Sequence, residues 1–456
     1  MVAPVGWAVP GSASVTEPAG LLSRLVDRGV IAQTTDPGAL ADLLDRPPVS
    51  FYTGFDPTAP SLHVGNLVQI LLGLRLQRAG HRPVVLIGGA TGLIGDPKAT
   101  GERSLNSPEV VAQWSAALTA QVSRYYDRSG PNAAIMVNNL EWTAPLTAIS
   151  LLRDIGKHIS VNRMLDRDAV AARLAGPGIS YTEFSYAILQ AYDYVELHRR
   201  YGVCLQTGGS DQWGNITAGV DLVRRMSQAA VHALTTPLLT KADGTKFGKT
   251  EAGTVWLDPA HTSAWDFHQF WRNADDRDLP GLLATFSLGE SAEVAAVLAD
   301  SQAHPSRRIG QQHLADSLTD LVHGADTTRQ VTTAAAALFG QASLAEVDTG
   351  TLQSALQQAG LTEWGEPVLP TPAQALHVTG LAASLSAARR TIAEGGASVN
   401  NERITQADEP IQADRVLPGG LLVIRRGRRA IAGISVRRPP ALVTGAVDPA
   451  SGQQQQ

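Results

Sequence analysis

The feature that most constrains the fold is a helix-like apolar segment followed at once by a fully apolar strand. Residues from about Val64 to Ala79 have the composition of a buried helix, Gly80 marks a turn, and the run PVVLIGG at 83–89 is apolar without alternation. A strand that is apolar on both sides must be covered on both faces, which is typical of parallel sheets built from β-α-β units. The sequence therefore predicts a doubly wound, Rossmann-like α/β domain.

Periodicity divides the rest of the chain. Helix-like segments near 109–126 and 181–200 alternate with strand-like segments near 134–137 and 203–209, which extends the α/β domain. Strand-like segments are then absent up to a Pro-containing stretch at 362–372. Beyond it, two short helix-like segments are followed by strand-like segments. We predict a disordered N-terminal extension at 1–18, a Rossmann-like domain at 19–250, a helical domain at 251–361, a linker at 362–372, a small α+β domain at 373–438 and a disordered tail at 439–456.

Composition narrows the class of protein. The 456 residues suggest two to four domains, and 44% apolar with 17% charged residues excludes a membrane bundle and a mostly disordered chain. Cys204 is the single cysteine, so no intramolecular disulfide forms and a reducing compartment is expected. The N-terminus has no Lys or Arg before Arg24 and no apolar run of the signal-peptide kind. We expect a cytoplasmic protein.

The charge is unevenly distributed. The net charge is −5, yet residues 371–438 carry ten Arg against five Asp or Glu, a net charge of +5. A basic module on an acidic body indicates contact with nucleic acid at that end of the chain. The candidate RNA-binding residues are Arg389, Arg390, Arg425, Arg426, Arg428 and Arg429.

A histidine-containing turn opens the apolar helix-like segment. The tetrapeptide His63-Val64-Gly65-Asn66 places an imidazole where a helix begins. The free N–H groups and positive dipole end of a helix N-terminus favour a phosphate, to which an imidazole can also donate. Taken alone, such a tetrapeptide is more often an ordinary capping turn with a surface histidine.

A second stretch combines two lysines with a glycine. The loop Lys246-Phe247-Gly248-Lys249-Thr250 follows ADGT, and the chain has only five Lys beside 32 Arg. Two of the five lysines therefore lie in one short loop, which favours a role that Arg does not fill. We interpret the loop as a mobile cationic clamp for polyphosphate, although a single run of this kind is usually a solvated surface loop.

Two further stretches place polar groups where a ligand could reach them. GGATGLIGDP at 88–97 ends the apolar strand and brings Asp96 to the carboxyl edge of the sheet, although a structural turn fits equally well. It lacks the G-x-G-x-x-G pattern of a dinucleotide site. Tyr186, Gln190 and Asp193 lie at i, i+4 and i+7, so they share one face of an otherwise apolar helix. That face is either solvated or binds a ligand with amino and hydroxyl groups.

Six stretches in order resemble the bacterial tyrosyl-tRNA synthetases, a family of class I aminoacyl-tRNA synthetases. They are YTGFDPT, HVGN, GGATGLIGDP, GISYTEFSYAILQAYDY, GGSDQWGN and ADGTKFGKT, and the resemblance spans about Leu21 to Arg438. It implies a catalytic α/β domain, a helical domain that recognises the anticodon, and a small RNA-binding C-terminal domain. It also implies a homodimer that binds L-tyrosine, ATP as a substrate, Mg²⁺ with the phosphates, and tyrosine tRNA, with no membrane partner.

The resemblance implies site residues position by position. The catalytic set is Thr58, His63, Arg103, Lys246, Lys249 and Thr250. The tyrosine-binding set is Tyr52, Asp96, Tyr186, Gln190, Asp193 and Gln212. Within it, the resemblance implies that Tyr52 and Asp193 hold the phenolic hydroxyl. The ATP-binding set is Thr53, Gly54, Asp56, His63, Gly65, Asn66, Gly209, Asp211 and Lys249. No metal ligand is predicted.

The sequence departs from the family pattern at two places. Asn66 stands where the first signature usually ends in a second His, and an amide can still donate and accept hydrogen bonds. Lys98 lies nearer Asp96 than the lysine that the family often places on the pyrophosphate side. We expect little effect from Asn66, whereas the pyrophosphate contact of the Lys98 loop stays open.

Three alternatives remain at this stage. A tryptophanyl-type synthetase shares the fold, but Tyr52 and Asp193 suit a phenol better than an indole, whose N–H only donates. A non-catalytic RNA-binding paralogue is disfavoured by the intact lysine loop. An inhibitor-resistant duplicate of the tyrosyl enzyme cannot be told apart from the housekeeping enzyme by one sequence.

Overall fold

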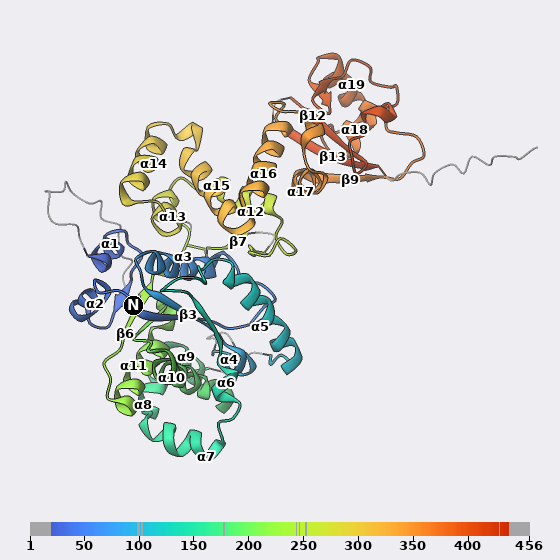
Figure 1. Ribbon diagram of the computed structural model, residues 1–456. Coiled ribbons are helices and arrows are strands. Elements are labelled where there is room, and N and C mark those ends of the chain that lie inside the picture. The colour runs from blue at the N-terminus through green and yellow to red at the C-terminus, as the bar shows by residue number, and fades with distance from the viewer. Residues whose placement is uncertain are drawn as a thin grey trace, which may run out of the picture. The chain divides into compact units, whose positions relative to one another are not determined.

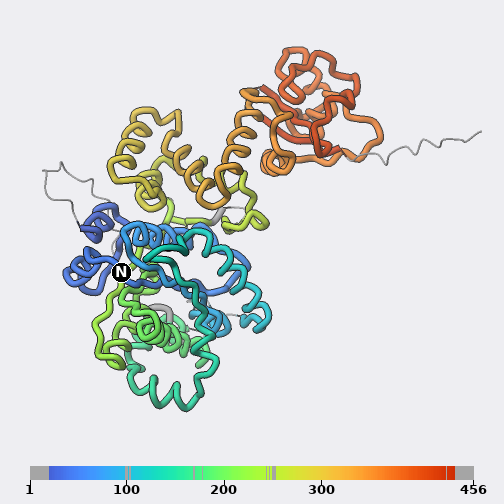
Figure 2. The backbone as a smooth tube through the Cα atoms, viewed as in Figure 1, coloured from blue at the N-terminus to red at the C-terminus, as the bar shows by residue number. Residues whose placement is uncertain are grey.

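The computed structural model describes residues 20–97, 101, 104–176, 178–242, 244–245, 247–250, 253–427 and 429–436. The chain forms two compact units (Figures 1 and 2). One comprises Met1–Thr262 with Gln269–Val322, and the other comprises Ser263–His268 with His323–Gln456. Helix α12 (Ala264–Arg272) contains the point at which the chain returns from the second unit to the first.

The first unit is built on a six-stranded sheet. Its strands are β1 (Gln33–Thr34), β2 (Ser50–Phe55), β3 (Arg82–Ile87), β4 (Ile135–Asn138), β5 (Leu205–Gly209) and β6 (His232–Thr236). The order is β1-β6-β5-β2-β3-β4, in which only the edge strand β1 is antiparallel to its neighbour. The predicted doubly wound parallel sheet is confirmed. The chain leaves β2 toward β3 and later returns to its other side with β5, so the direction of winding reverses between β5 and β2.

Helices cover both faces of this sheet, as the apolar strand β3 requires. The helices between residues 21 and 227 are α1 (Leu21–Asp27), α2 (Pro37–Leu44), α3 (Val64–Arg78), α4 (Gly89–Ile94), α5 (Pro108–Ser123), α6 (Leu140–Thr143), α7 (Ala148–Ser150), α8 (Val161–Leu165), α9 (Asp168–Leu174), α10 (Tyr181–Tyr201) and α11 (Trp213–Ser227). Val84 and Leu86 of β3 pack with residues of α10 and α11 in one core cluster, whereas Phe51 of β2 packs with Leu72 and Leu76 of α3 in another. β2 to β6 are thus sandwiched between two apolar layers.

Two arginines attach the helices at 279–323 to the sheet of the first unit. These helices are α13 (Leu279–Phe286), α14 (Ser291–Ala303) and α15 (Ile309–His323). The guanidinium of Arg28 donates to the carbonyl oxygens of Ala284, Ser287 and Gly289, and Arg75 donates to the carbonyl of Thr285 at 2.6 Å. The last carbonyls of a helix have no partner within it, so these side chains cap α13. Burial lowers the pKa of Arg75 to about 9.

The second unit joins helices to a five-stranded sheet. Its helices are α16 (Ala325–Leu338), α17 (Thr349–Gly360), α18 (Pro372–Val378) and α19 (Leu385–Ala393). Its strands are β9 (Leu361–Trp364), β10 (Ala397–Val399), β11 (Glu402–Arg403), β12 (Leu421–Arg426) and β13 (Ala430–Val436), in the order β11-β10-β12-β13-β9. Alternate residues of β12 serve opposite faces, so Leu421 and Val423 pack with α17, and Leu422 and Ile424 pack with α18 and α19.

The observed division differs from the predicted domains in two respects. The predicted linker 362–372 begins inside β9, which pairs in parallel with β13 from Leu361 opposite Gly433 to Trp364 opposite Val436. The predicted helical domain 251–361 is split, since 269–322 belongs to the first unit and 323–361 to the second. Proline and charge patterns mark exposed turns, but they carry no information about which distant strand a segment pairs with. No helix of the described residues is long and apolar enough to cross a membrane.

Candidate functional site

A cavity of about 620 Å³ opens at the carboxyl ends of β2, β3, β5 and β6. It lies where the direction of winding reverses, which is the place at which open α/β sheets bind their ligands. The predicted site residues that line it are Tyr52, Gly54, Asp56, Thr58, His63, Gly65, Asn66, Asp96, Tyr186, Gln190, Asp193, Gly209, Asp211 and Gln212. Residues from separate parts of the chain therefore converge as the resemblance implied.

The innermost part of the cavity holds Tyr52 and Asp193, both 1% exposed. The Asp193 carboxylate accepts hydrogen bonds from Asn139 Nδ2 at 3.0 Å and from Trp142 Nε1 at 2.8 Å. Burial raises the pKa of Asp193 to about 7, against the lowering effect of these two donors. Tyr52 stacks edge-on against Tyr194 with ring centroids 5.1 Å apart. A phenol could thus meet one acceptor and one hydroxyl here.

Tyr186 and Asp56 connect the helix α10 to the end of β2. The Tyr186 hydroxyl donates to Asp56 Oδ2 at 2.6 Å, and Asp56 Oδ1 accepts from Thr91 Oγ1 at 2.7 Å. Burial, followed by the negative charges of Asp56 and Asp96, raises the pKa of Tyr186 well above its ordinary value. The phenol therefore stays protonated and acts as a hydrogen-bond donor to Asp56.

Four buried polar atoms of the cavity have no hydrogen-bond partner within the described structure: Tyr52 Oη, Gln69 Oε1, Gln190 Oε1 and Gln206 Oε1. Each such atom costs about 1–3 kcal/mol if it stays unpaired. All four belong to side chains that line the same cavity. Their grouping indicates that the cavity is shaped for a ligand that supplies hydrogen-bond donors and acceptors.

His63 is the N-cap of α3. Its Nδ1 accepts from the backbone N–H of Gly65 at 3.0 Å, and Asn66 Oδ1 accepts from the backbone N–H of His63 at 3.1 Å. These two bonds form a capping box, so Asn66 has a local structural role. Because Nδ1 accepts, the proton of the neutral imidazole lies on Nε2, which is a donor suited to a phosphate oxygen.

The predicted lysine loop lies against the start of α3. Gly248 has φ +82°, and a Cβ on it would lie 2.7 Å from Val64 Cγ2, so glycine is required by both conformation and space. Lys249 and Thr250 form the short strand β7 (Lys249–Thr250), which pairs with β8 (Gly253–Thr254). Arg103 and Lys246 lie outside the described residues. The loop backbone is therefore near the predicted phosphate site.

Thr53 is a predicted site residue that does not line the cavity directly. It is 2% exposed, and its Oγ1 lies 2.5 Å from Thr207 Oγ1. Thr207 itself lines the cavity, so Thr53 lies directly behind the cavity wall. An ATP contact by Thr53 stays a prediction.

A cavity residue and several residues that support the cavity were missed in the sequence. Asn139 and Trp142 orient Asp193, Gln206 lines the wall, and Asn215 bonds to Asp96 and Gln212. Asn139 follows β4 directly, so its position at the carboxyl end of a strand was a signal that could have been used. Asn215 lies in GGSDQWGN, within the resemblance, but nothing in the sequence pairs it with Asp96.

The predicted RNA-binding arginines of the second unit have different surroundings. Arg390, Arg426 and Arg429 are exposed, whereas Arg428 lies outside the described residues. Arg389 bonds to Asp408 at 2.9 Å, and Arg425 bonds to Asn401 at 3.0 Å. An exposed ion pair is weak, so Arg389 can exchange Asp408 for a phosphate, but Arg425 is held in the fold.

Comparison with known families assigns both parts of the chain. Residues 44–340 match the family described as class I tRNA synthetases (W and Y), and residues 372–432 match the SYY-like C-terminal domain of tyrosine–tRNA ligase. The tyrosine–tRNA ligase of Acidothermus cellulolyticus is 55% identical over 419 residues, which cover 91% of this chain and 98% of that protein. That of Streptomyces avermitilis is 54% identical and covers 91% and 99%.

Solved structures agree with this assignment. A C-terminally truncated mitochondrial tyrosyl-tRNA synthetase of Aspergillus nidulans is 30% identical, covers 69% of this chain and 93% of its own, and superposes with a TM-score of 0.63. A tryptophanyl-tRNA synthetase of Encephalitozoon cuniculi, 16% identical and covering 69% and 88%, has a TM-score of 0.50, which shows a shared fold alone. Sequence identity over nearly the whole length, rather than fold, separates the two specificities, and the chain belongs to the tyrosine–tRNA ligase family of class I aminoacyl-tRNA synthetases.

Proposed function

We propose that this chain activates L-tyrosine with ATP in the cavity described above and transfers the tyrosyl group to the 3′ end of tyrosine tRNA. In the first step the tyrosine carboxylate attacks the α-phosphorus of ATP and pyrophosphate leaves. In the second step a ribose hydroxyl of the tRNA attacks the tyrosyl carbonyl and AMP leaves. Neither step requires a nucleophile from the protein, so catalysis consists of positioning and charge neutralisation.

The observation that carries this proposal is that Tyr52 Oη, which has no partner among the described residues, and the Asp193 carboxyl group both belong to buried residues of the cavity wall. A substrate phenol donates to the Asp193 carboxylate and accepts from the Tyr52 hydroxyl. Phenylalanine would satisfy neither group, and an indole N–H could serve only Asp193. The chemistry of this end therefore favours tyrosine over both other aromatic amino acids.

The other site residues bind the remaining parts of tyrosine and of ATP. Asp96, Tyr186 and Gln190 hold the ammonium group of tyrosine, and Gln212 holds the carboxylate region. Thr58 and the Nε2 of His63 contact the ATP phosphates, while Asn66, Gly209 and Asp211 contact the adenosine. Lys246, Lys249 and Arg103 neutralise the pyrophosphate as it leaves. Thr53 stays a proposed contact of the adenosine.

Magnesium ions enter with the nucleotide in this proposal. No group of three or more His, Cys, Asp or Glu able to hold a metal occurs among the residues that the structure describes. Magnesium keeps several waters and is commonly bound through substrate phosphates, which suits a site of this kind. The ion would add positive charge on the pyrophosphate side.

A homodimer is the second part of the proposal. Exposed apolar side chains gather between residues 149 and 181, with Ile149 70%, Leu152 57%, Val161 57% and Tyr181 68% exposed. Large apolar side chains exposed together mark protein interfaces. A second copy of the chain is the expected occupant, and Leu152→Asp should shift the mass measured by light scattering from dimer to monomer. An unchanged mass for this variant, or a monomeric parent, would contradict the dimer.

The tRNA and the compartment complete the proposal. The exposed Arg390, Arg426 and Arg429 of the second unit are suited to RNA phosphates, and the hydrogen bond from Gly427 N to Gly396 O (2.7 Å) brings the β12–β13 turn beside the end of α19. The single Cys204 suits a reducing cytoplasm.

Amino-acid-dependent pyrophosphate exchange tests the function. The wild-type chain should exchange label into ATP with tyrosine and not with tryptophan or phenylalanine, and it should then charge tyrosine tRNA. Exchange with tryptophan alone would exclude the proposed specificity. Binding of tRNA without any exchange would instead show a non-catalytic paralogue.

A further inference from the structure

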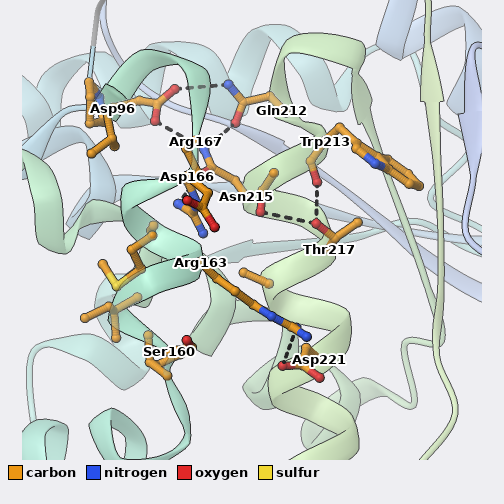
Figure 3. Close-up of a pocket in the computed structure, with 18 of the residues that line it drawn as sticks. Asp96, Ser160, Arg163, Asp166, Arg167, Gln212, Trp213, Asn215, Thr217 and Asp221 are labelled. Atoms are coloured by element: carbon orange, nitrogen blue, oxygen red, sulfur yellow. Dashed lines mark hydrogen bonds and ion pairs between the residues drawn. The ribbon is translucent and has the colours of Figure 1, made fainter. Parts of the chain in front are cut away.

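Asp96 and Gln212 lie in a closed hydrogen-bonded triangle whose third member is Asn215 (Figure 3). Gln212 Nε2 donates to Asp96 Oδ2 at 3.0 Å. Asn215 Nδ2 donates to Asp96 Oδ1 at 3.2 Å and to Gln212 Oε1 at 3.0 Å. Each of the three side chains is thus bonded to the other two, which fixes the plane of the carboxylate and the orientation of both amides.

Arg167, from a different part of the chain, fixes the orientation of the Asn215 amide in this triangle. Its Nη1 donates to Asn215 Oδ1 at 2.6 Å. A guanidinium has only donors, so it can bond to the oxygen end of the Asn215 amide but not to the nitrogen end. The NH₂ group of Asn215 is therefore directed at Asp96 and Gln212, whereas a flipped amide would place its oxygen against the Asp96 carboxylate.

The location of Arg167 makes this contact specific. Arg167 is the residue before α9, and its side chain lies across the first turn of α11, where a Cβ on Gly214 would be 3.6 Å from Arg167 Cγ. Asp96 partly offsets the lowering of the Arg167 pKa that burial causes. The guanidinium thus stays charged beside the triangle.

We propose that Asn215 is a positioning residue that fixes Asp96 and Gln212 for the α-amino and carboxylate groups of the substrate, and that Arg167 acts through it by fixing the orientation of its amide. The inference rests on the proposed function, since it assigns the two fixed groups to the amino-acid substrate. It predicts that disorder of the triangle weakens binding of the amino acid but not of ATP.

Pyrophosphate exchange with four variants tests the inference. Asn215→Ala should raise the KM for tyrosine about tenfold, because an ionised carboxylate loses a donor, and should change the KM for ATP less than twofold. Tyramine, which keeps the phenol and ammonium but lacks the carboxylate, should show the same tenfold rise in its inhibition constant. Arg167→Met should act in the same direction by several-fold, and the double variant should be no worse than Asn215→Ala alone.

Thr217→Val is the matched control. Thr217 lies on the same helix as Asn215 and lines the same pocket (Figure 3), but its hydroxyl bonds, among the described residues, only to the carbonyls of Trp213 and Gly214. All constants should therefore stay within twofold of the wild type. Arg167→Met keeps the test decisive if Asn215→Ala does not fold.

Three results would overturn the inference: tyrosine and tyramine constants within twofold of the wild type in both single variants, an equal rise in the KM for ATP, or additive effects in the double variant. Absence of tyrosine-dependent exchange in the wild type would instead overturn the proposed function, and the inference with it.

Discussion

Replacing Tyr52 by phenylalanine should stabilise the fold while weakening the binding of tyrosine. The Tyr52 side chain is 1% exposed, and its hydroxyl has no partner within the described structure. Removing an unpaired buried hydroxyl relieves a cost of about 1 kcal/mol, at the lower end of the usual range because water entering the cavity can satisfy part of it. The same change removes the donor that the substrate phenol would accept from, which costs about 1 kcal/mol of affinity.

Two measurements separate these opposite effects. A gain of about 1 kcal/mol should raise the thermal transition of the first unit by roughly 2 °C in calorimetry. A loss of about 1 kcal/mol should raise the dissociation constant for tyrosine about fivefold in titration calorimetry. Binding of phenylalanine should improve relative to tyrosine, because the unpaired hydroxyl that penalises it is absent.

Tyr194→Phe is the control for this prediction. Tyr194 is 0% exposed and stacks on Tyr52, but its hydroxyl donates to the carbonyl of His232 at 2.8 Å and does not line the cavity. Its removal leaves a buried carbonyl without that donor, so stability should fall by about 1 kcal/mol while tyrosine affinity is unchanged. A loss of stability in Tyr52→Phe, or an unchanged affinity for tyrosine, would refute the reasoning.

The remaining predictions concern pH, the lysine loop and the RNA-binding face. Because burial raises the pKa of Asp193 to about 7, the folded chain binds a proton there that the unfolded chain does not, so this carboxyl lowers stability as pH rises from about 4 to 7. The tyrosine affinity of the wild type should fall about tenfold for each pH unit below 7. Titrations of Asp193→Asn should lose this pH dependence. Gly248→Ala, which strains the loop, and Lys249→Ala should lower the adenylation rate in stopped flow and leave the dissociation constant of tyrosine within twofold; an unaltered rate would exclude the clamp. The pair Arg426→Ala and Arg429→Ala should weaken tRNA charging, reduce its salt dependence and leave pyrophosphate exchange unchanged; equal charging would exclude an RNA role for this turn.

These substitutions replace a truncation that the sequence alone would recommend. A linker at 362–372 suggests that everything after Leu369 could be deleted without effect on adenylate formation. The structure shows that Leu421 and Val423 share a core cluster with Leu352 and Leu356 of α17. Deletion would expose that cluster, so the loss of charging could arise from misfolding instead of from lost RNA contacts.

The sequence by itself determined the fold class, the family and about half of the residues that line the cavity. The unbroken apolar run of β3 requires cover on both faces, and the structure provides it. His63 and Asn66 could be placed at a helix start because capping is a local interaction between residues three apart. Signals of this kind depend only on neighbours in the chain, so they are legible without a structure.

Tertiary structure decided which distant groups meet. Asp193 receives its donors from Asn139 and Trp142, 54 and 51 residues away, and this contact with burial sets its pKa. Thr53 contacts Thr207, 154 residues away, because β2 and β5 pair in parallel in this register. Periodicity shows which face of an element is polar, whereas packing of separate elements selects the partner that this face meets.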